Sequence, residues 1–138
     1  MFKKIMVAAD GSDHSVQAAE YARELAVKFG GAVDVVYVVN GENARADALH
    51  HNDPFEIEKA RKEKISQVRA EFEEAQFDYE LHILHGDPGP TLVEFVETEG
   101  YDCVVLGSRG LNKLQKFLLG SVSHKVAKRV NCPVLIVK

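Results

Sequence analysis

The sequence predicts an α/β fold with a mostly parallel sheet that is covered by helices on both faces. Apolar runs rich in valine and isoleucine alternate along the chain with segments whose apolar residues recur every three or four positions. Turn-forming glycine, aspartate, serine or asparagine separates many of these segments. Strands that alternate with helices build βαβ units, and such units produce parallel sheets with helices on both sides.

The chain opens with a strand and a helix. Ile5–Ala9 is a short apolar run, and it is predicted to be the first strand. A helix follows, in which apolar residues from Val16 to Phe29 have helical spacing. Ser12 or Asp13 is expected to cap its start, because both residue types accept hydrogen bonds from the first free N–H groups of a helix.

A valine-rich second strand is predicted at Ala32–Val39, buried on both faces. The polar stretch Asn40–Pro54 is interpreted as a long mobile loop. Phe55–Gln76 is rich in charged residues and carries an apolar stripe, which predicts one solvated amphipathic helix. Phe77–His85 has alternating apolar residues and is predicted to be the third strand.

The last part of the chain repeats the same alternation. A third helix is predicted before Gly100. The fourth strand is predicted at Asp102–Leu106, the fourth helix at Ser121–Val130 and the last strand at Pro133–Val137. Pro133 suits the first position of a strand, because no ladder N–H is needed there.

Composition limits the classes of function. The 138 residues are interpreted as one domain, residues 1–138, with 46% hydrophobic and 28% charged residues. A net charge of −4 does not favour nucleic acid as a partner, and no apolar run is long enough for membrane insertion. Cys103 and Cys132 lie in or beside apolar runs and are expected in the core, so a cytoplasmic location is the default.

Three glycines and three serines follow the predicted fourth strand: Gly107, Ser108, Gly110, Gly120, Ser121 and Ser123. Glycine lets the backbone approach a ligand closely, because it has no Cβ. The N-terminus of the next helix adds free N–H groups and a partial positive charge, which suit a phosphate. This pattern makes a nucleotide the leading candidate ligand.

Basic charge is concentrated in the same part of the chain. Residues 103–138 contain seven basic side chains and no acidic one, whereas residues 1–102 carry a net charge of −11. An anion is therefore expected near the glycine-rich loop, which contains Arg109. For Lys125, Lys128 and Arg129 the alternative is a favourable interaction with the C-terminal end of their own helix.

The position of Asp10 suggests that it shares a crevice with this loop. Ligands of open parallel sheets bind beyond the carboxyl ends of strands, where the strand order reverses. Asp10 follows the first strand and Gly107 follows the fourth. If these two strands are neighbours at the reversal, both residues face one crevice. The alternative for Asp10 is a role confined to shaping its turn.

The spacing Gly107-x2-Gly110-x9-Gly120-Ser121 resembles the ATP-binding pattern of the universal stress protein family. The opening Ala9-Asp10-Gly11-Ser12, the valine-rich second strand and the closing segment 131–137 are also similar. The resemblance covers essentially the whole chain. It implies a three-layer α/β/α sandwich with a five-stranded parallel sheet in the order 3-2-1-4-5, of the adenine nucleotide alpha hydrolase-like type, and a homodimer formed through the last strand.

The resemblance also implies a binding role for eleven residues. Asp10 would contact the nucleotide or its Mg²⁺, the backbone of Val38 would contact adenine, and Gly120 to Ser123 would contact the phosphates of ATP. The implied set is Ala9, Asp10, Val38, Leu106, Gly107, Arg109, Gly110, Gly120, Ser121, Val122 and Ser123. Arg109 lies at a position that varies in the family, so we expect its backbone, more than its side chain, to contact the nucleotide.

Three classes of function remain open from the sequence. The first is an ATP-binding regulator of the stress response, with an unidentified protein partner; the second is an enzyme of slow ATP hydrolysis or phosphoryl transfer; the third is a nucleotide-free interaction module. Neither a P-loop nor a Gly-x-Gly-x-x-Gly fingerprint is present. His82 and His85 lie three apart on a predicted strand and therefore point to opposite faces, so they make a poor metal-binding pair.

Overall fold

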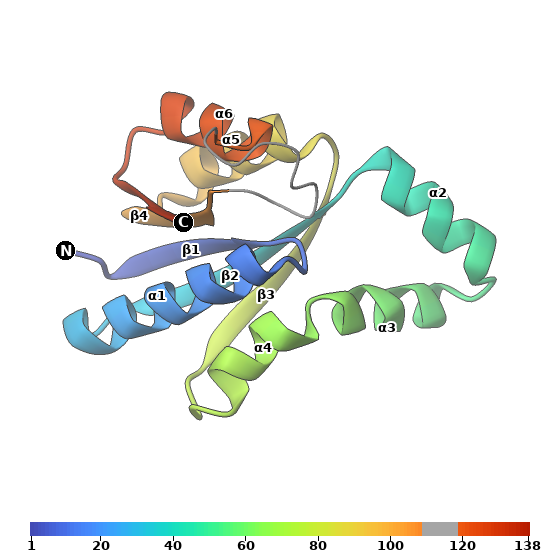
Figure 1. Ribbon diagram of the computed structural model, residues 1–138, viewed down its shortest axis with the longest axis horizontal. Coiled ribbons are helices and arrows are strands. Elements are labelled where there is room, and N and C mark those ends of the chain that lie inside the picture. The colour runs from blue at the N-terminus through green and yellow to red at the C-terminus, as the bar shows by residue number, and fades with distance from the viewer. Residues whose placement is uncertain (109–118) are drawn as a thin grey trace.

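The computed structural model describes residues 1–108 and 119–138, and its centre is a five-stranded sheet (Figure 1). The strand order is β3-β2-β1-β4-β5, and each neighbouring pair is parallel. The strands are β1 (Lys4–Ala9), β2 (Ala32–Val39), β3 (Tyr79–His85), β4 (Cys103–Gly107) and β5 (Val134–Val137). The predicted fold class and strand order are therefore confirmed.

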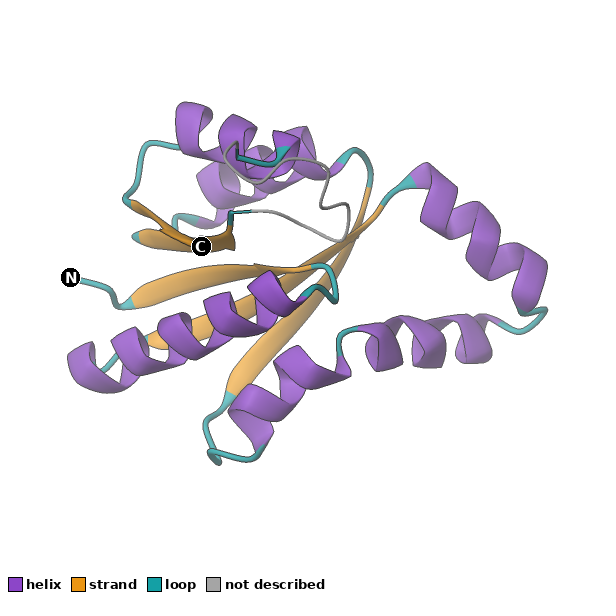
Figure 2. Cartoon of the chain, in the orientation of Figure 1, coloured by secondary structure: helices purple, strands orange, loops and turns teal. Residues whose placement is uncertain are grey.

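Helices cover both faces of the sheet (Figure 2). Helices α1 (Asp13–Phe29) and α4 (Ser66–Glu73) lie on one face, and α5 (Pro88–Glu99) and α6 (Ser121–Arg129) lie on the other. Alternate strand residues point to opposite faces, so the strands contribute to two cores. One core joins Val7 and Val35 to Ala22 of α1 and Phe72 of α4, whereas the other joins alternate strand residues such as Val36 to α5 and α6.

Three of the predicted helix boundaries have clear local causes. Ser12 is the N-cap of α1, because its hydroxyl accepts a hydrogen bond of 3.2 Å from the N–H of Ser15. Gly30 ends the helix in the left-handed conformation, with φ 67°. Gly100 ends α5 in the same way, with φ 72°.

The prediction of a loop at Asn40–Pro54 is wrong, because most of this stretch is the helix α2 (Gly41–His50). Asn40 caps it, and its side chain accepts a hydrogen bond of 2.8 Å from the N–H of Asn43. None of the α2 residues is buried. The sequence therefore has no apolar stripe there, and periodicity could not indicate the helix.

The prediction of one continuous helix at Phe55–Gln76 is also wrong. The structure has two helices, α3 (Pro54–Lys64) and α4, with a break at Ile65. The backbone of Ile65 leaves the helical region, with φ −107° and ψ 22°, while its side chain is fully buried in the core. Figure 1 shows α2 and α3 as an arm beside the sheet, whereas α4 lies against it.

The third strand begins at Tyr79, two residues later than predicted. The N–H of Phe77 donates a hydrogen bond of 2.9 Å to the carbonyl of Phe72, so Phe77 closes the turn that follows α4 and does not pair in the sheet. Gln76 has a positive φ of 55° in this turn. Among the residues that the structure describes, no helix is long and apolar enough to cross a bilayer.

Candidate functional site

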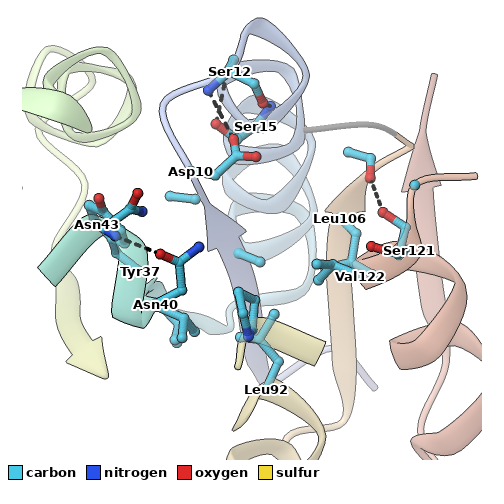
Figure 3. Close-up of a pocket in the computed structure, with 18 of the residues that line it drawn as sticks. Asp10, Ser12, Ser15, Tyr37, Asn40, Asn43, Leu92, Leu106, Ser121 and Val122 are labelled. Carbon is cyan, nitrogen blue, oxygen red and sulfur yellow. Dashed lines mark hydrogen bonds between the residues drawn. The ribbon is translucent and has the colours of Figure 1, made fainter. Parts of the chain in front are cut away.

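A cavity of about 520 Å³ lies at the carboxyl ends of the central strands (Figure 3). Strand β1 pairs with β2 on one side and with β4 on the other, so the strand order reverses at this point. The volume is in the range of small-molecule sites. The lining residues are Ala8, Ala9, Asp10, Ser12, Ser15, Val36, Tyr37, Val38, Asn40, Glu42, Asn43, Pro88, Leu92, Leu106, Gly107, Gly120, Ser121, Val122 and Ser123.

Nine of the eleven residues predicted for the site line this one cavity. They come from the ends of three strands and from the start of α6: Ala9, Asp10, Val38, Leu106, Gly107, Gly120, Ser121, Val122 and Ser123. The other two, Arg109 and Gly110, lie outside the described residues. The expected shared crevice of Asp10 and the end of β4 is therefore present.

Asp10 lies in a tight turn between β1 and α1. Its Oδ1 accepts a hydrogen bond of 2.9 Å from the N–H of Ser12, and Ser12 in turn caps α1. Gly11 permits this turn with φ 86°, and a Cβ there would lie 2.8 Å from the carbonyl oxygen of Lys64. The carboxyl group of Asp10 thus shapes its turn and also faces the cavity, so the two roles considered for it are compatible.

Gly107 is required by packing inside the protein. A Cβ at this position would lie 2.6 Å from the Cβ of His14, in the first turn of α1. The end of β4 therefore passes directly against α1. From the sequence, the glycine is predicted to allow close approach of a ligand, whereas in the structure it allows close approach of a helix. Its main chain still lines the cavity.

The N-terminus of α6 faces the cavity through four consecutive residues, from Gly120 to Ser123. The first N–H groups of a helix have no partner within it, and within the described part of the chain no side chain caps α6. Two hydrogen bonds fix this end against β4. The hydroxyl of Ser123 donates to the carbonyl of Gly107 at 2.6 Å, and the N–H of Gly120 donates to the carbonyl of Ser108 at 2.8 Å.

The opposite wall was missed by sequence reasoning. Asn40 and Asn43 stand there, across the cavity from Ser121 and Val122, as Figure 3 shows. They belong to the N-cap and first turn of α2, which was predicted to be a loop. The available signal was the position of Asn40 directly after a buried strand, at the edge of the sheet where ligands bind.

The charges around the cavity are arranged unevenly. Asp10 and Glu42 contribute carboxyl groups, and no lysine or arginine is among the described residues that line it. Positive potential in this part of the site comes from the N-terminus of α6, whose dipole places about half a positive charge there. An anion would therefore be held mainly by main-chain N–H groups, and a cation would be needed to offset the nearby carboxylates.

Comparison with known proteins agrees with this architecture. The model of the universal stress protein family matches residues 1–138. The chain belongs to this family. Universal stress protein MJ0531 of Methanocaldococcus jannaschii is 33% identical over 141 residues, which cover 100% of this chain and 83% of that protein.

Two solved structures place this universal stress protein among its relatives. Hypothetical protein MJ0577, from Methanocaldococcus jannaschii, superposes with a TM-score of 0.81 at 29% identity and covers 100% of this chain and 96% of that one. A universal stress protein solved in complex with cAMP superposes with a TM-score of 0.68 at 27% identity, covering 99% of this chain and 96% of that one. A relative with this fold therefore binds an adenine nucleotide.

Proposed function

We propose that this universal stress protein binds ATP with Mg²⁺ and acts as a nucleotide-dependent regulator in the stress response. The N-terminus of α6, which no described side chain caps, is the single observation that carries the proposal. It aims free N–H groups into a cavity of suitable size, at the switch point of a parallel sheet. The relative that was solved with cAMP supports an adenine nucleotide as the ligand class.

The proposed contacts divide the cavity into two parts. Gly120, Ser121, Val122 and Ser123 would donate hydrogen bonds to the phosphates, together with Arg109 and Gly110, which lie outside the described residues. Ala9, Val38, Leu106 and Gly107 would line the adenosine. Asp10 would hold Mg²⁺ through its carboxylate, and the ion would offset the repulsion between that carboxylate and the phosphates.

The direct test is the identification of small molecules in the freshly purified protein. The protein is denatured, the released compounds are analysed by mass spectrometry, and the emptied protein is titrated with ATP, AMP and GTP in the presence of Mg²⁺. We expect ATP to be released or to bind more tightly than AMP and GTP. An empty protein with no thermal shift at millimolar ATP would contradict the proposal and favour a nucleotide-free interaction module.

Slow ATP hydrolysis is the second candidate, and the carboxylates of Asp10 and Glu42 in the cavity favour it, because they can position Mg²⁺ on a phosphate chain. Single-turnover measurements with an excess of protein distinguish the two. ADP that accumulates with the wild type and not with Asp10→Ala would identify an enzyme. ATP that stays intact for hours would identify a binding protein.

We also propose a homodimer in the cytoplasm that contacts a further protein. Strand β5 ends the strand order beside β4, so its outer edge is available in the described chain for pairing with a second copy. Cys103 and Cys132 are both free thiols, which fits a reducing compartment. Light scattering after gel filtration tests the dimer, and the mass of a single chain across the working concentration range would exclude it.

A further inference from the structure

A second group of ligand-type side chains lies on the sheet, away from the cavity. It consists of Asp34 on β2 and of Glu80 and His82 on β3. Asp34 pairs with Glu80 in the parallel register, and His82 is two residues further along β3 on the same face. One ligand atom from each residue lies within 4.8 Å of the other two. The pairing of β2 with β3 thus assembles one imidazole and two carboxylates.

The distances between these atoms suit a metal ion. His82 Nε2 is 3.4 Å from Asp34 Oδ2 and 3.5 Å from Glu80 Oε2. Zinc bonds to nitrogen and oxygen are about 2.0–2.2 Å long, so two ligand atoms of a tetrahedral site lie about 3.3–3.6 Å apart. The two distances from His82 therefore match a tetrahedral ligand set, and the carboxylate oxygens of Asp34 and Glu80 lie within 4.8 Å of each other.

The imidazole nitrogen of His82 that faces the carboxylates makes no hydrogen bond within the described structure. His82 Nε2 is shielded from solvent and has no hydrogen-bond partner among the described residues, although it faces both carboxylates. A buried polar atom without a partner costs free energy. Coordination of a cation through the nitrogen lone pair would remove this cost, and would offset the negative charge of the two carboxylates.

Neighbouring side chains hold two of the three ligands, Asp34 and His82, in place. The hydroxyl of Tyr101 donates a hydrogen bond of 2.6 Å to Asp34 Oδ2, and the ring of His82 packs against Phe95 at 5.2 Å between centroids. Such outer contacts orient the ligands of many metal sites. The ammonium group of Lys4 lies over the Tyr101 ring and donates a hydrogen bond to the carbonyl of Glu99.

We propose that Asp34, Glu80 and His82 bind a divalent transition-metal ion, with water in the remaining coordination position. An imidazole nitrogen ligand favours Zn²⁺ and other first-row transition-metal ions over Mg²⁺. Asp34 precedes Val38 by four residues on β2, which places the site about 13 Å along the strand from the nucleotide cavity. The ion would join the edge strand β3 to the interior strand β2. Because this site is separate from the nucleotide cavity, the proposal does not depend on nucleotide binding.

The test uses the full-length protein, freed of metal with a chelator and then dialysed. Calorimetric titration with Zn²⁺ should show one site per chain, and Zn²⁺ should raise the melting temperature. Glu80→Gln and His82→Gln should each weaken binding by roughly tenfold or more. The Glu80 side chain is exposed and that of His82 is 30% exposed, so the variants are expected to fold, and circular dichroism in the presence of a chelator checks this.

His85→Gln is the matched control, because His85 is exposed and lies on the same strand but on the opposite face. It should bind Zn²⁺ like the wild type. Absence of stoichiometric Zn²⁺ binding overturns the proposal. Full affinity in either Glu80→Gln or His82→Gln also overturns it, because the metal would then be held elsewhere, for example by the pair His50 and His51. An equal loss in His85→Gln has the same consequence.

Discussion

Ser123 and Gly107 are joined by a hydrogen bond of 2.6 Å, from the Ser123 hydroxyl to the Gly107 carbonyl. The bond connects the first turn of α6 to the carboxyl end of β4. It therefore fixes the direction in which the helix N-terminus points into the cavity. A side chain inside the helix thus positions the main-chain N–H groups that we propose as the phosphate site.

Replacement of Ser123 tests this link. Ser123→Ala leaves the Gly107 carbonyl without its partner, and it should lower the free energy of unfolding by about 1–2 kcal/mol. Binding of ATP should also weaken, because the start of α6 is no longer held against β4. Chemical denaturation and calorimetry measure the two effects. The exposed Ser121→Ala serves as the control for stability, and an unchanged unfolding curve for Ser123→Ala would show that the bond is unimportant.

Substitution of Gly120 tests whether this glycine is needed for contact with the ligand or for the backbone conformation. Its φ of −60° and ψ of 158° lie in the extended region, so Gly120→Val should keep the fold, with a loss of about 1 kcal/mol because valine is a poorer N-cap than glycine. The added side chain should enter the space of the phosphates and weaken ATP binding by roughly tenfold or more, about 1.4 kcal/mol. Gly41→Val is the control, because a Cβ at Gly41 has no neighbour within 4 Å. Full affinity of Gly120→Val would remove Gly120 from the site.

The role of Asp10 depends on magnesium. Asp10→Asn keeps an oxygen that can accept the hydrogen bond from Ser12 but removes the charge. Affinity for ATP with Mg²⁺ should fall, whereas affinity for ATP in the presence of EDTA should stay equal or rise, because repulsion of the phosphates is removed. Calorimetry under both conditions gives the comparison, with the exposed Asp13→Asn as control. A similar change under both conditions would argue against a metal contact.

The two thiols should differ in reactivity. Cys103 is only 1% exposed, and burial raises the pKa of its thiol to about 11. At pH 8 only about 0.1% of such a group is thiolate, the reactive form, and the thiolate fraction rises with pH. Cys132 is half-buried, so a disulfide reagent should modify it first and reach Cys103 only on unfolding. Native labelling that persists in Cys132→Ser would contradict this order.

Regular periodicity made most of the fold predictable. The second strand, Ala32–Val39, has the predicted bounds, and α1 begins after one of the two predicted caps, Ser12. Both segments pack against the sheet, so their apolar residues had to follow the period of the element. Helix α2 buries no residue, and its sequence carries no such period. The break at Ile65 arises because this side chain is buried in the core, which a local pattern does not show.

The candidate site likewise contains residues that could be predicted from the sequence and residues that could not. Residues that directly follow strands, such as Asp10 and Gly107, could be placed at one edge of the sheet from topology alone. The contribution of Asn40 and Asn43 required knowledge of α2. The true neighbour of Gly107, His14, is far from it in the sequence, so the sequence alone suggested a ligand where a helix packs.

The alternation of strands and helices, the glycine spacing and the residues at the ends of the strands can be read from the chain alone, because each depends on local backbone and burial preferences. What those residues face depends on how the elements pack. The grouping of Asp34 with His82 is an example, since it depends on the parallel register of β2 and β3. Residues 48 positions apart become neighbours only when the two strands have paired, and no local pattern encodes that pairing.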